Sequence, residues 1–312
     1  MIRRLFGRLL CALLVCVAAF AAPVWAAAPK PRNAVASAHP LATAAGMEML
    51  RAGGNAFDAA VAVSAVLAVV EPASSGVGGG GFYLLHTAKG SRDIMVDARE
   101  TAPMAARADM YVAPDRAPGT SSTDGPLAAG IPGEPAAWAH LASRYGRLPL
   151  ARSLGPAIRI AREGFPLYAR LQNAIRVKQA RLAGSADASQ VFLQAGEVLP
   201  VGAVIRQPDL AATLELLARE GADGFYRGPF ADRLVEGIRR DGGLWTREDL
   251  ARYHVIERAP LLLHYRDATL VTAAPPSSGG VVIGEALNIL AGYDRSRLDA
   301  DTWRHLVIEA LR

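Results

Sequence analysis

The sequence predicts an α/β globular protein. Hydrophobic residues make up 51% of the chain and charged residues 20%, which is typical of a protein that folds around an apolar core. Several segments have apolar residues at helical spacing, and shorter β-branched or aromatic runs lie between Gly, Pro and polar clusters. Helices and strands therefore both contribute to the expected fold.

Residues 1–26 are predicted to be a cleavable signal peptide. Arginines stand near its start, and the apolar run that follows, over 9–22, is too short for a comfortable membrane span. Val24 and Ala26 offer the small residues that a signal peptidase reads, so we expect cleavage after Ala26. An uncleaved anchor is the alternative.

Removal of this segment changes what the composition implies. It takes away three arginines and no acid, so the net charge falls from +5 to +2, which gives no basis for binding nucleic acid. It also removes both cysteines, Cys11 and Cys16, and with them any disulfide, thiol nucleophile or Cys metal site. We expect a linker over 27–33, a domain over 34–312, and export to the periplasm or the outside of a bacterium.

The first elements of the domain are defined by strong local signals. A helix is predicted over 41–52, where Gly53 and Gly54 end it. Asn55 is the expected N-cap of a second helix, whose run from residue 59 to residue 70 has no charge and is therefore expected to be buried. Two strand-like segments then predict a hairpin, over 82–87 and 93–96.

The rest of the domain is predicted to be mainly helical. Helices are expected over 136–145, 150–163, 167–183, 210–220, 230–240, 281–291 and 302–312, with a further helix starting after Thr246, and strands over 261–265 and 269–273. Residues 184–190 are predicted to be a polar loop. The last helix has no stop signal, so we expect the natural sequence to continue beyond it.

A glycine run over 76–81 satisfies the spacing G-x-G-x-x-G of a dinucleotide-binding loop. That fingerprint requires a strand before it and a helix after it, so that the phosphate meets the helix N-terminus. Here a predicted helix precedes the run and a predicted strand follows it, which argues against phosphate binding. The expected role is steric, because glycine lets backbone approach backbone or a ligand.

Local patterns leave two further candidates open. Arg99 ends a predicted strand between Asp97 and Glu100, where it could bind a carboxylate, although the spacing alone favours an ion pair with one of these acids. Ser277 and Ser278 stand at a strand-to-helix turn, where a nucleophile is conceivable and plain turn chemistry is the simpler interpretation. The six histidines show no metal-ligand spacing, and no metal or cofactor is predicted.

Long motifs then follow one another in a recognisable order. An opening signature covers 36–62, the glycine motif 74–82, and the motif V-D-A-R-E-T-A-P 96–103. Further motifs lie at 196–214, 225–229, 244–250 and 275–281. From about Asn33 to its last residue, the chain resembles the γ-glutamyltranspeptidase family.

The resemblance implies a fold and an activity. The fold is the αββα sandwich of the N-terminal-nucleophile hydrolases, of which this chain would supply the large-subunit portion. In the family, a proenzyme cuts itself into two subunits, and the new N-terminal Thr of the small subunit attacks the γ-glutamyl amide of glutathione. The acyl group then passes to water or to an amino acid. The resemblance places Arg99 at the substrate α-carboxylate and implies neither a cofactor nor a metal.

The chain also departs from the family pattern. The nucleophile motif Thr-Thr-His-x-Ser and the later glycine pair of the oxyanion hole are not present, and both are expected beyond Arg312. The chain alone is therefore predicted to be inactive, with glutathione, amino-acid or peptide acceptors and the small subunit as its expected partners. The alternatives are a glutaryl or cephalosporin acylase of the same superfamily and a non-catalytic truncated binding product, with nucleotide binding the most distant.

Overall fold

Helix α2 (Pro40–Arg51) opens the part of the chain that the computed structural model describes, which is residues 33–112 and 121–312. The predicted signal peptide over 1–26 lies outside the described residues, as does all but the last residue of the predicted linker over 27–33. Residues 35–312 form one compact unit.

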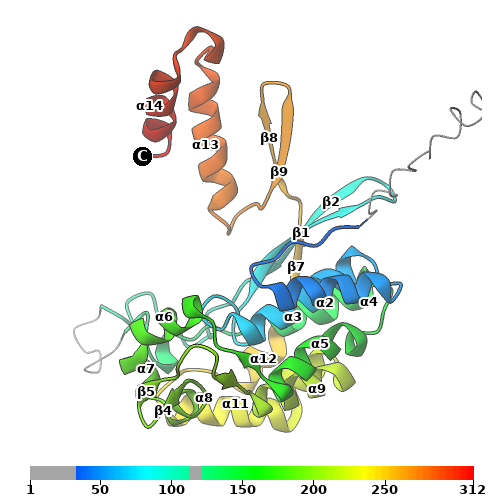
Figure 1. The fold of residues 1–312 in the computed structure, drawn as a ribbon, viewed down its shortest axis with the longest axis vertical. Coiled ribbons are helices and arrows are strands. Elements are labelled where there is room, and N and C mark those ends of the chain that lie inside the picture. The colour runs from blue at the N-terminus through cyan, green and yellow to red at the C-terminus, as the bar shows by residue number, and fades with distance from the viewer. Residues whose placement is uncertain (1–32, 113–120) are drawn as a thin grey trace, which may run out of the picture. The chain divides into compact units, whose positions relative to one another are not determined.

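Helix α3 (Ala56–Val70) is the buried centre of the helical layer, as its uncharged run predicts (Figure 1). Asn55 accepts backbone N–H groups of Phe57 and Asp58, and Asp58 accepts the N–H of Asn55, so that a complete capping box starts the helix. Helix α3 packs against α2 and against α5 (Leu150–Glu163).

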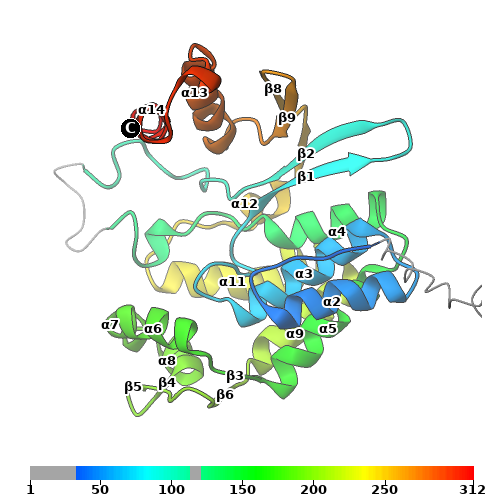
Figure 2. The ribbon, with the colours of Figure 1, turned by 45° about the horizontal axis from the view of Figure 1, so that its top comes forward.

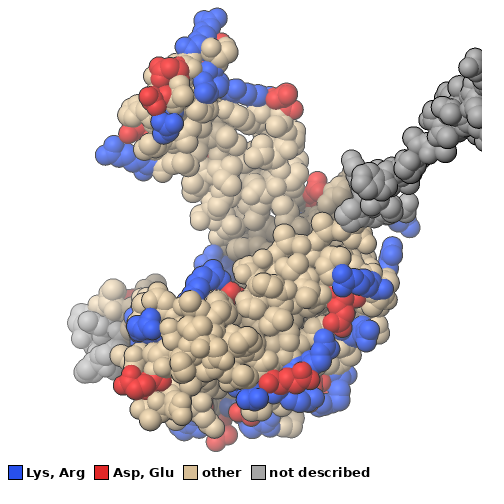
Figure 3. Space-filling view, viewed as in Figure 1, with Lys and Arg blue, Asp and Glu red and all other residues tan. Residues whose placement is uncertain are grey.

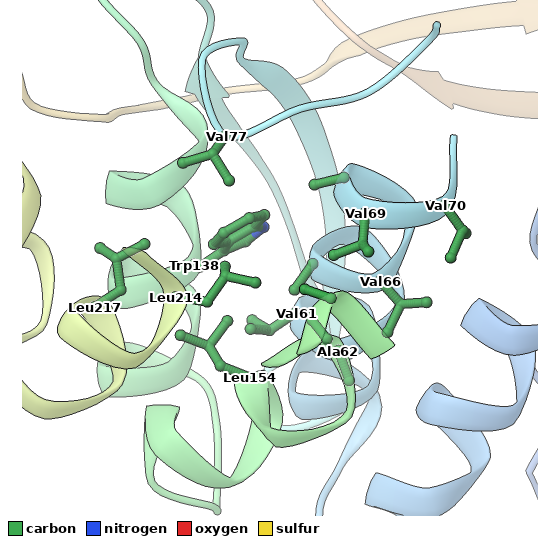
Figure 4. Packing of buried hydrophobic residues seen from close by; sticks show 14 of the residues in the cluster. Val61, Ala62, Val66, Val69, Val70, Val77, Trp138, Leu154, Leu214 and Leu217 are labelled. Atoms are coloured by element: carbon green, nitrogen blue, oxygen red, sulfur yellow. The ribbon is translucent and has the colours of Figure 1, made fainter. Parts of the chain in front are cut away.

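The main hydrophobic core lies where α3 and α5 meet two further helices, α4 (Glu134–Arg144) and α9 (Pro208–Glu220). Figure 4 shows the side chains at this junction, including Trp138, Leu154 and Leu214, none of which is exposed to solvent. The leucines of α9 stand at helical spacing, which is the signal that predicted this helix.

A three-stranded antiparallel sheet forms the second layer. Strand β1 (Gly81–Thr87) pairs with β2 (Arg92–Ala98), which confirms the predicted hairpin, and β2 pairs with β7 (Ile256–Arg258) on its other side. The last five residues of β2 are all buried. Strand β7 was not predicted, because it is three residues long and its partner lies about 160 residues earlier, so no local pattern marks it.

Two helix predictions in the middle of the chain need correction. The helix expected over 167–183 is divided into α6 (Ala169–Val177) and α7 (Gln179–Ala183). The polar loop expected over 184–190 is wrong, because α8 (Ala186–Phe192) forms there. Its N-cap Ser185 accepts the backbone N–H of Ala188, which offsets the weak helix propensity of this polar segment.

The remaining elements of this part agree with the predictions or are short additions to them. The described elements include α10 (Ala222–Tyr226), α11 (Gly228–Arg240), α12 (Arg247–Arg252), the 3-10 turns Pro126–Ala128 and Arg295–Arg297, and the two-residue strands β3 (Phe165–Pro166), β4 (Leu193–Gln194), β5 (Glu197–Val198) and β6 (Val204–Ile205). Thr246 starts α12 with a capping box that includes Asp249, as its position predicts.

The C-terminal segment consists of a hairpin and two helices, all of them predicted. Strands β8 (Leu261–Tyr265) and β9 (Ala268–Thr272) pair with each other, and α13 (Gly279–Ala291) contacts both β8 and α14 (Ala300–Ala310) (Figure 2). None of the helices in the described part of the chain is both long and apolar enough to cross a membrane.

Candidate functional site

The glycine run connects α3 to β1 and lies against the end of β2. A Cβ added to Gly80 would stand 2.2 Å from the carbonyl oxygen of Ala98, a distance that real side chains do not reach, whereas one added to Gly79 would meet nothing closer than 3.4 Å. The carbonyl of Gly79 accepts the N–H groups of Gly133 and Glu134, at 2.8 and 3.0 Å. None of the five glycines has a left-handed φ. The predicted steric role is therefore confirmed at Gly80, where close backbone approach requires glycine, and not at Gly79.

A cavity of about 560 Å³ lies over this run. Its wall is formed by the glycines, by the segment that precedes them, by the start of β1 and by two acids, Glu100 and Glu134, and no Lys or Arg among the described residues lines it. The context that a phosphate site needs is also absent here, since a helix precedes the run and a strand follows it. The structure thus agrees with the rejection of the nucleotide fingerprint.

Glu134 is held rigidly in the wall of this cavity. It is only 6% exposed, and one of its oxygens accepts hydrogen bonds from Ser64, from the Tyr83 hydroxyl and from the Trp138 ring N–H. Burial, and then the charge of Glu134, raise the pKa of Tyr83 well above its ordinary value, so the phenol remains a donor. Sequence analysis missed this network, because its four members come from three elements and are joined only by the fold.

Arg99 stands directly after β2, and its side chain is exposed. Its Nη1 donates to the carbonyl of Pro276 at 3.3 Å. Within the described residues it forms an ion pair with neither Asp97 nor Glu100; Asp97 instead pairs with Arg258, at 2.8 Å from its Nε. The local ion pair that the spacing favoured is therefore wrong, and the reason is that β7 brings a second arginine to Asp97.

A second cavity, of about 620 Å³, is lined in part by Arg99. Arg107, Glu100 and Gly78 also line it, and the last two line the first cavity as well, so the two spaces adjoin. The site thus combines a guanidinium with a carboxylate at one rim. This arrangement can bind a small zwitterion, since the guanidinium forks onto a carboxylate and the acid accepts an ammonium group.

The serine candidates occupy the predicted strand-to-helix turn before α13. Ser278 is the N-cap of α13, and neither its hydroxyl nor that of Ser277 is hydrogen-bonded to a histidine or an acid among the residues that the structure describes. A Cβ on Gly280 would lie 2.4 Å from the Ala273 carbonyl oxygen. These contacts favour the interpretation as a turn, because a serine nucleophile needs a base within hydrogen-bonding reach.

Comparisons with known proteins agree with this geometry. The family model described as gamma-glutamyltranspeptidase matches residues 42–312. The chain is 40% identical over 306 residues to a glutathione hydrolase proenzyme of Pseudomonas sp. (strain A14), covering 97% of this chain and 52% of that relative. It therefore spans about half the length of the curated relatives it matches.

Solved structures give the same result for the fold. A Helicobacter pylori gamma-glutamyltranspeptidase superimposes with a TM-score of 0.86 at 34% identity, covering 91% of this chain and 82% of that one. A cephalosporin acylase from Bacillus halodurans reaches a TM-score of 0.79 at 34% identity, covering 91% of this chain and 55% of that one. The predicted N-terminal-nucleophile hydrolase fold, in its large-subunit portion, is confirmed, and the chain belongs to the gamma-glutamyltranspeptidase family.

Proposed function

We propose that this chain is the greater part of the large subunit of an exported γ-glutamyltransferase and glutathione hydrolase. The complete enzyme cleaves the γ-glutamyl amide of glutathione or a related compound and passes the acyl group to water, an amino acid or a peptide. The observation that carries the proposal is Arg99, which reaches a cavity wall without an ion pair to either neighbouring acid. Family membership supports the same reaction.

In the proposed reaction, this chain binds the substrate and the small subunit supplies the chemistry. Arg99 holds the α-carboxylate of the γ-glutamyl group through charge-assisted hydrogen bonds, and Glu100 accepts its α-ammonium group. The N-terminal Thr of the small subunit attacks the γ-carbonyl, with its own α-amino group as the general base. Attack forms the Thr ester and expels the amine, and water or an acceptor amine then releases the γ-glutamyl group.

The small subunit is also the proposed partner of the C-terminal segment. Val281, Val282, Ile283 and Ile289 of α13 are each more than 40% exposed, and Leu262 of β8 is 55% exposed. Figure 3 shows that the surface over α13 and the β8–β9 hairpin is largely uncharged. Contiguous apolar surface of this kind is typical of protein interfaces. We also propose that residues 1–26 direct export to the periplasm or the medium.

Substitution of Arg99 tests the proposal in the processed enzyme from the complete reading frame. Arg99→Ala should raise KM for a γ-glutamyl anilide roughly 100-fold, because loss of charge-assisted hydrogen bonds to the substrate carboxylate costs about 3 kcal/mol. Arg99→Lys should have a KM between those of the unsubstituted enzyme and Arg99→Ala, since lysine keeps the charge and loses the two parallel hydrogen bonds of the guanidinium. Arg92→Ala, at the far end of β2, is the matched control. An unchanged KM in Arg99→Ala would refute the carboxylate role.

The purified 312-residue chain offers a second test. We propose that it does not release the aniline from a γ-glutamyl anilide, because the attacking Thr belongs to the small subunit. Release of the aniline by the pure chain would contradict this.

An acylase is the second candidate function, favoured by the similarity to the Bacillus cephalosporin acylase. A glutaryl amide carries the same terminal carboxylate as a γ-glutamyl amide but lacks the ammonium group, so Arg99 suits both and Glu100 separates them. We expect kcat/KM to favour the γ-glutamyl anilide, and Glu100→Gln to reduce that preference. A preference for the glutaryl compound in the unsubstituted enzyme would establish the acylase instead.

A further inference from the structure

We propose that Asp97 is a positioning residue for substrate binding: it fixes the peptide that presents Arg99, while Arg258 keeps the Asp97 charge away from the Arg99 guanidinium. Tyr253 holds Arg99 from its carbonyl side. This inference rests on the proposed role of Arg99 and adds three residues to it, none of which touches the substrate.

The carboxylate of Asp97 has two separate partners. Its Oδ1 accepts a hydrogen bond from the backbone N–H of Arg99 at 3.1 Å, and its Oδ2 accepts one from the Nε–H of Arg258 at 2.8 Å. Asp97 is 7% exposed and is the residue of β2 that pairs with Ile256 of β7, so that Arg258 lies two residues along the partner strand. One buried side chain therefore joins the end of β2 to β7 and to the first residue after the strand.

The carbonyl side of Arg99 is held by a second contact. The Tyr253 hydroxyl donates to the Arg99 carbonyl oxygen at 2.9 Å, and its ring stacks on Tyr226 with centroids 5.5 Å apart and planes at 8°. Burial, and then the charges of Asp97 and Glu100, raise the pKa of Tyr253, so the phenol stays protonated and donates.

Gly133 makes room for this arrangement. A Cβ at that position would lie 1.9 Å from the Ala98 carbonyl oxygen and 2.2 Å from the Tyr253 hydroxyl. Hydrogen bonds hold the peptide groups on both sides of the Arg99 Cα, through its N–H and its C=O, so the exposed side chain starts from a fixed point at the cavity wall. Fixing the group that binds the substrate reduces the entropy lost on binding.

The pairing with Arg258 has a second consequence. Asp97 is two residues from Arg99, and a free carboxylate there would compete with the substrate for the guanidinium. Arg258 occupies that carboxylate, and Arg99 remains available to an incoming carboxylate. The geometry thus explains how an arginine flanked by two acids stays open to a ligand.

The test compares two substrates in the processed full-length enzyme: a γ-glutamyl anilide and the anilide of butyrate, which lacks the carboxylate and the ammonium group. Asp97→Ala should raise KM for the γ-glutamyl compound about tenfold, with little change in kcat, since misplacing a binding group weakens binding. The rate with the butyryl compound should not change. Asp97→Asn, which keeps an acceptor for the Arg99 N–H, should restore most of the affinity.

A double-mutant cycle separates this inference from the proposed function. In an Arg99→Ala background, Asp97→Ala should have no further effect, because the residue acts through Arg99. If Arg99→Ala leaves KM unchanged, the proposed function fails. If Arg99→Ala raises KM while Asp97→Ala does not, or if the two effects multiply, only the positioning role is overturned.

Tyr253→Phe provides an independent arm should Asp97→Ala not fold or process. It removes one hydroxyl and keeps the stacked ring, and we expect roughly a threefold, carboxylate-selective rise in KM, as for the loss of one hydrogen bond of modest net strength. Equal losses with both anilides in Tyr253→Phe would show a general structural role and overturn the proposal.

Discussion

Helices α3 and α13 are similar in apolar composition and differ in how much of that apolar surface is buried. Each is rich in aliphatic residues and has a single charged residue, Asp58 in α3 and Glu285 in α13. In α3, nine of fifteen residues are buried, whereas α13 buries two glycines, Ala286 and Leu290 and exposes its valines. An apolar helix is usually a buried one, so the exposure of α13 is what the proposed packing of the small subunit against this face would explain.

The two regions should therefore respond differently when apolar side chains are removed. Leu154→Ala in α5, where the side chain is fully buried, should lower the free energy of unfolding of the 312-residue chain by about 2–5 kcal/mol. Ile289→Ala in α13, at 48% exposure, should lower it by less than about 0.5 kcal/mol. Urea unfolding followed by circular dichroism measures both. Equal losses would mean that α13 is already part of a closed core in this chain.

Adding a side chain at the glycine run sharpens the comparison from the opposite direction. Gly80→Ala should destabilise the chain by about 3 kcal/mol, because its methyl group would overlap the Ala98 carbonyl and force the end of β2 away. Gly79→Ala should be nearly neutral. The two variants add the same methyl group at neighbouring positions, so equal melting temperatures would show that the run is not tightly packed at Gly80.

A polar contact within the packed region should also depend on pH. Burial alone would raise the pKa of Asp249, but hydrogen bonds from the Met104 N–H and from Thr246 outweigh it and hold this pKa below its ordinary value of 3.8. The stabilisation is therefore present above about pH 4 and is lost as the pH falls further.

Asp249→Asn should accordingly cost about 1.5 kcal/mol near pH 7, since one oxygen acceptor is replaced by a donor. The difference from the unsubstituted chain should shrink in unfolding measurements as the pH falls below about 4 and then through the lowered pKa of Asp249, where the folded carboxylate takes up a proton. Glu248→Gln, on the same turn but exposed, is the control. A difference that grows on acidification would contradict the assigned role of the carboxylate.

The sequence predicted the elements whose signals are local and missed those whose cause is distant. Asn55 and Thr246 mark helix starts through their own side chains, and both capping boxes form. Strand β7 and the pairing of Asp97 with Arg258 could not be found in this way, because they join residues about 160 positions apart. Arg99 was located by its motif, but the side chains that leave it unpaired with its neighbours are supplied by the fold.

The smallest effect on stability, and the sharpest test of the comparison, is expected at the exposed face of α13. Val282→Lys, at 50% exposure, should leave the unfolding of the 312-residue chain unchanged within about 0.5 kcal/mol and reduce its self-association, because a charge interrupts the apolar patch. In the complete proenzyme the same substitution should weaken subunit association, since a charge buried at an interface without a partner is costly.

Arg304→Lys, on the exposed surface of α14, is the matched control. Sedimentation measures the first effect, and the yield of processed, associated subunits measures the second. Normal assembly in Val282→Lys would show that this face stays in solvent, and the contrast with α3 would then need another cause.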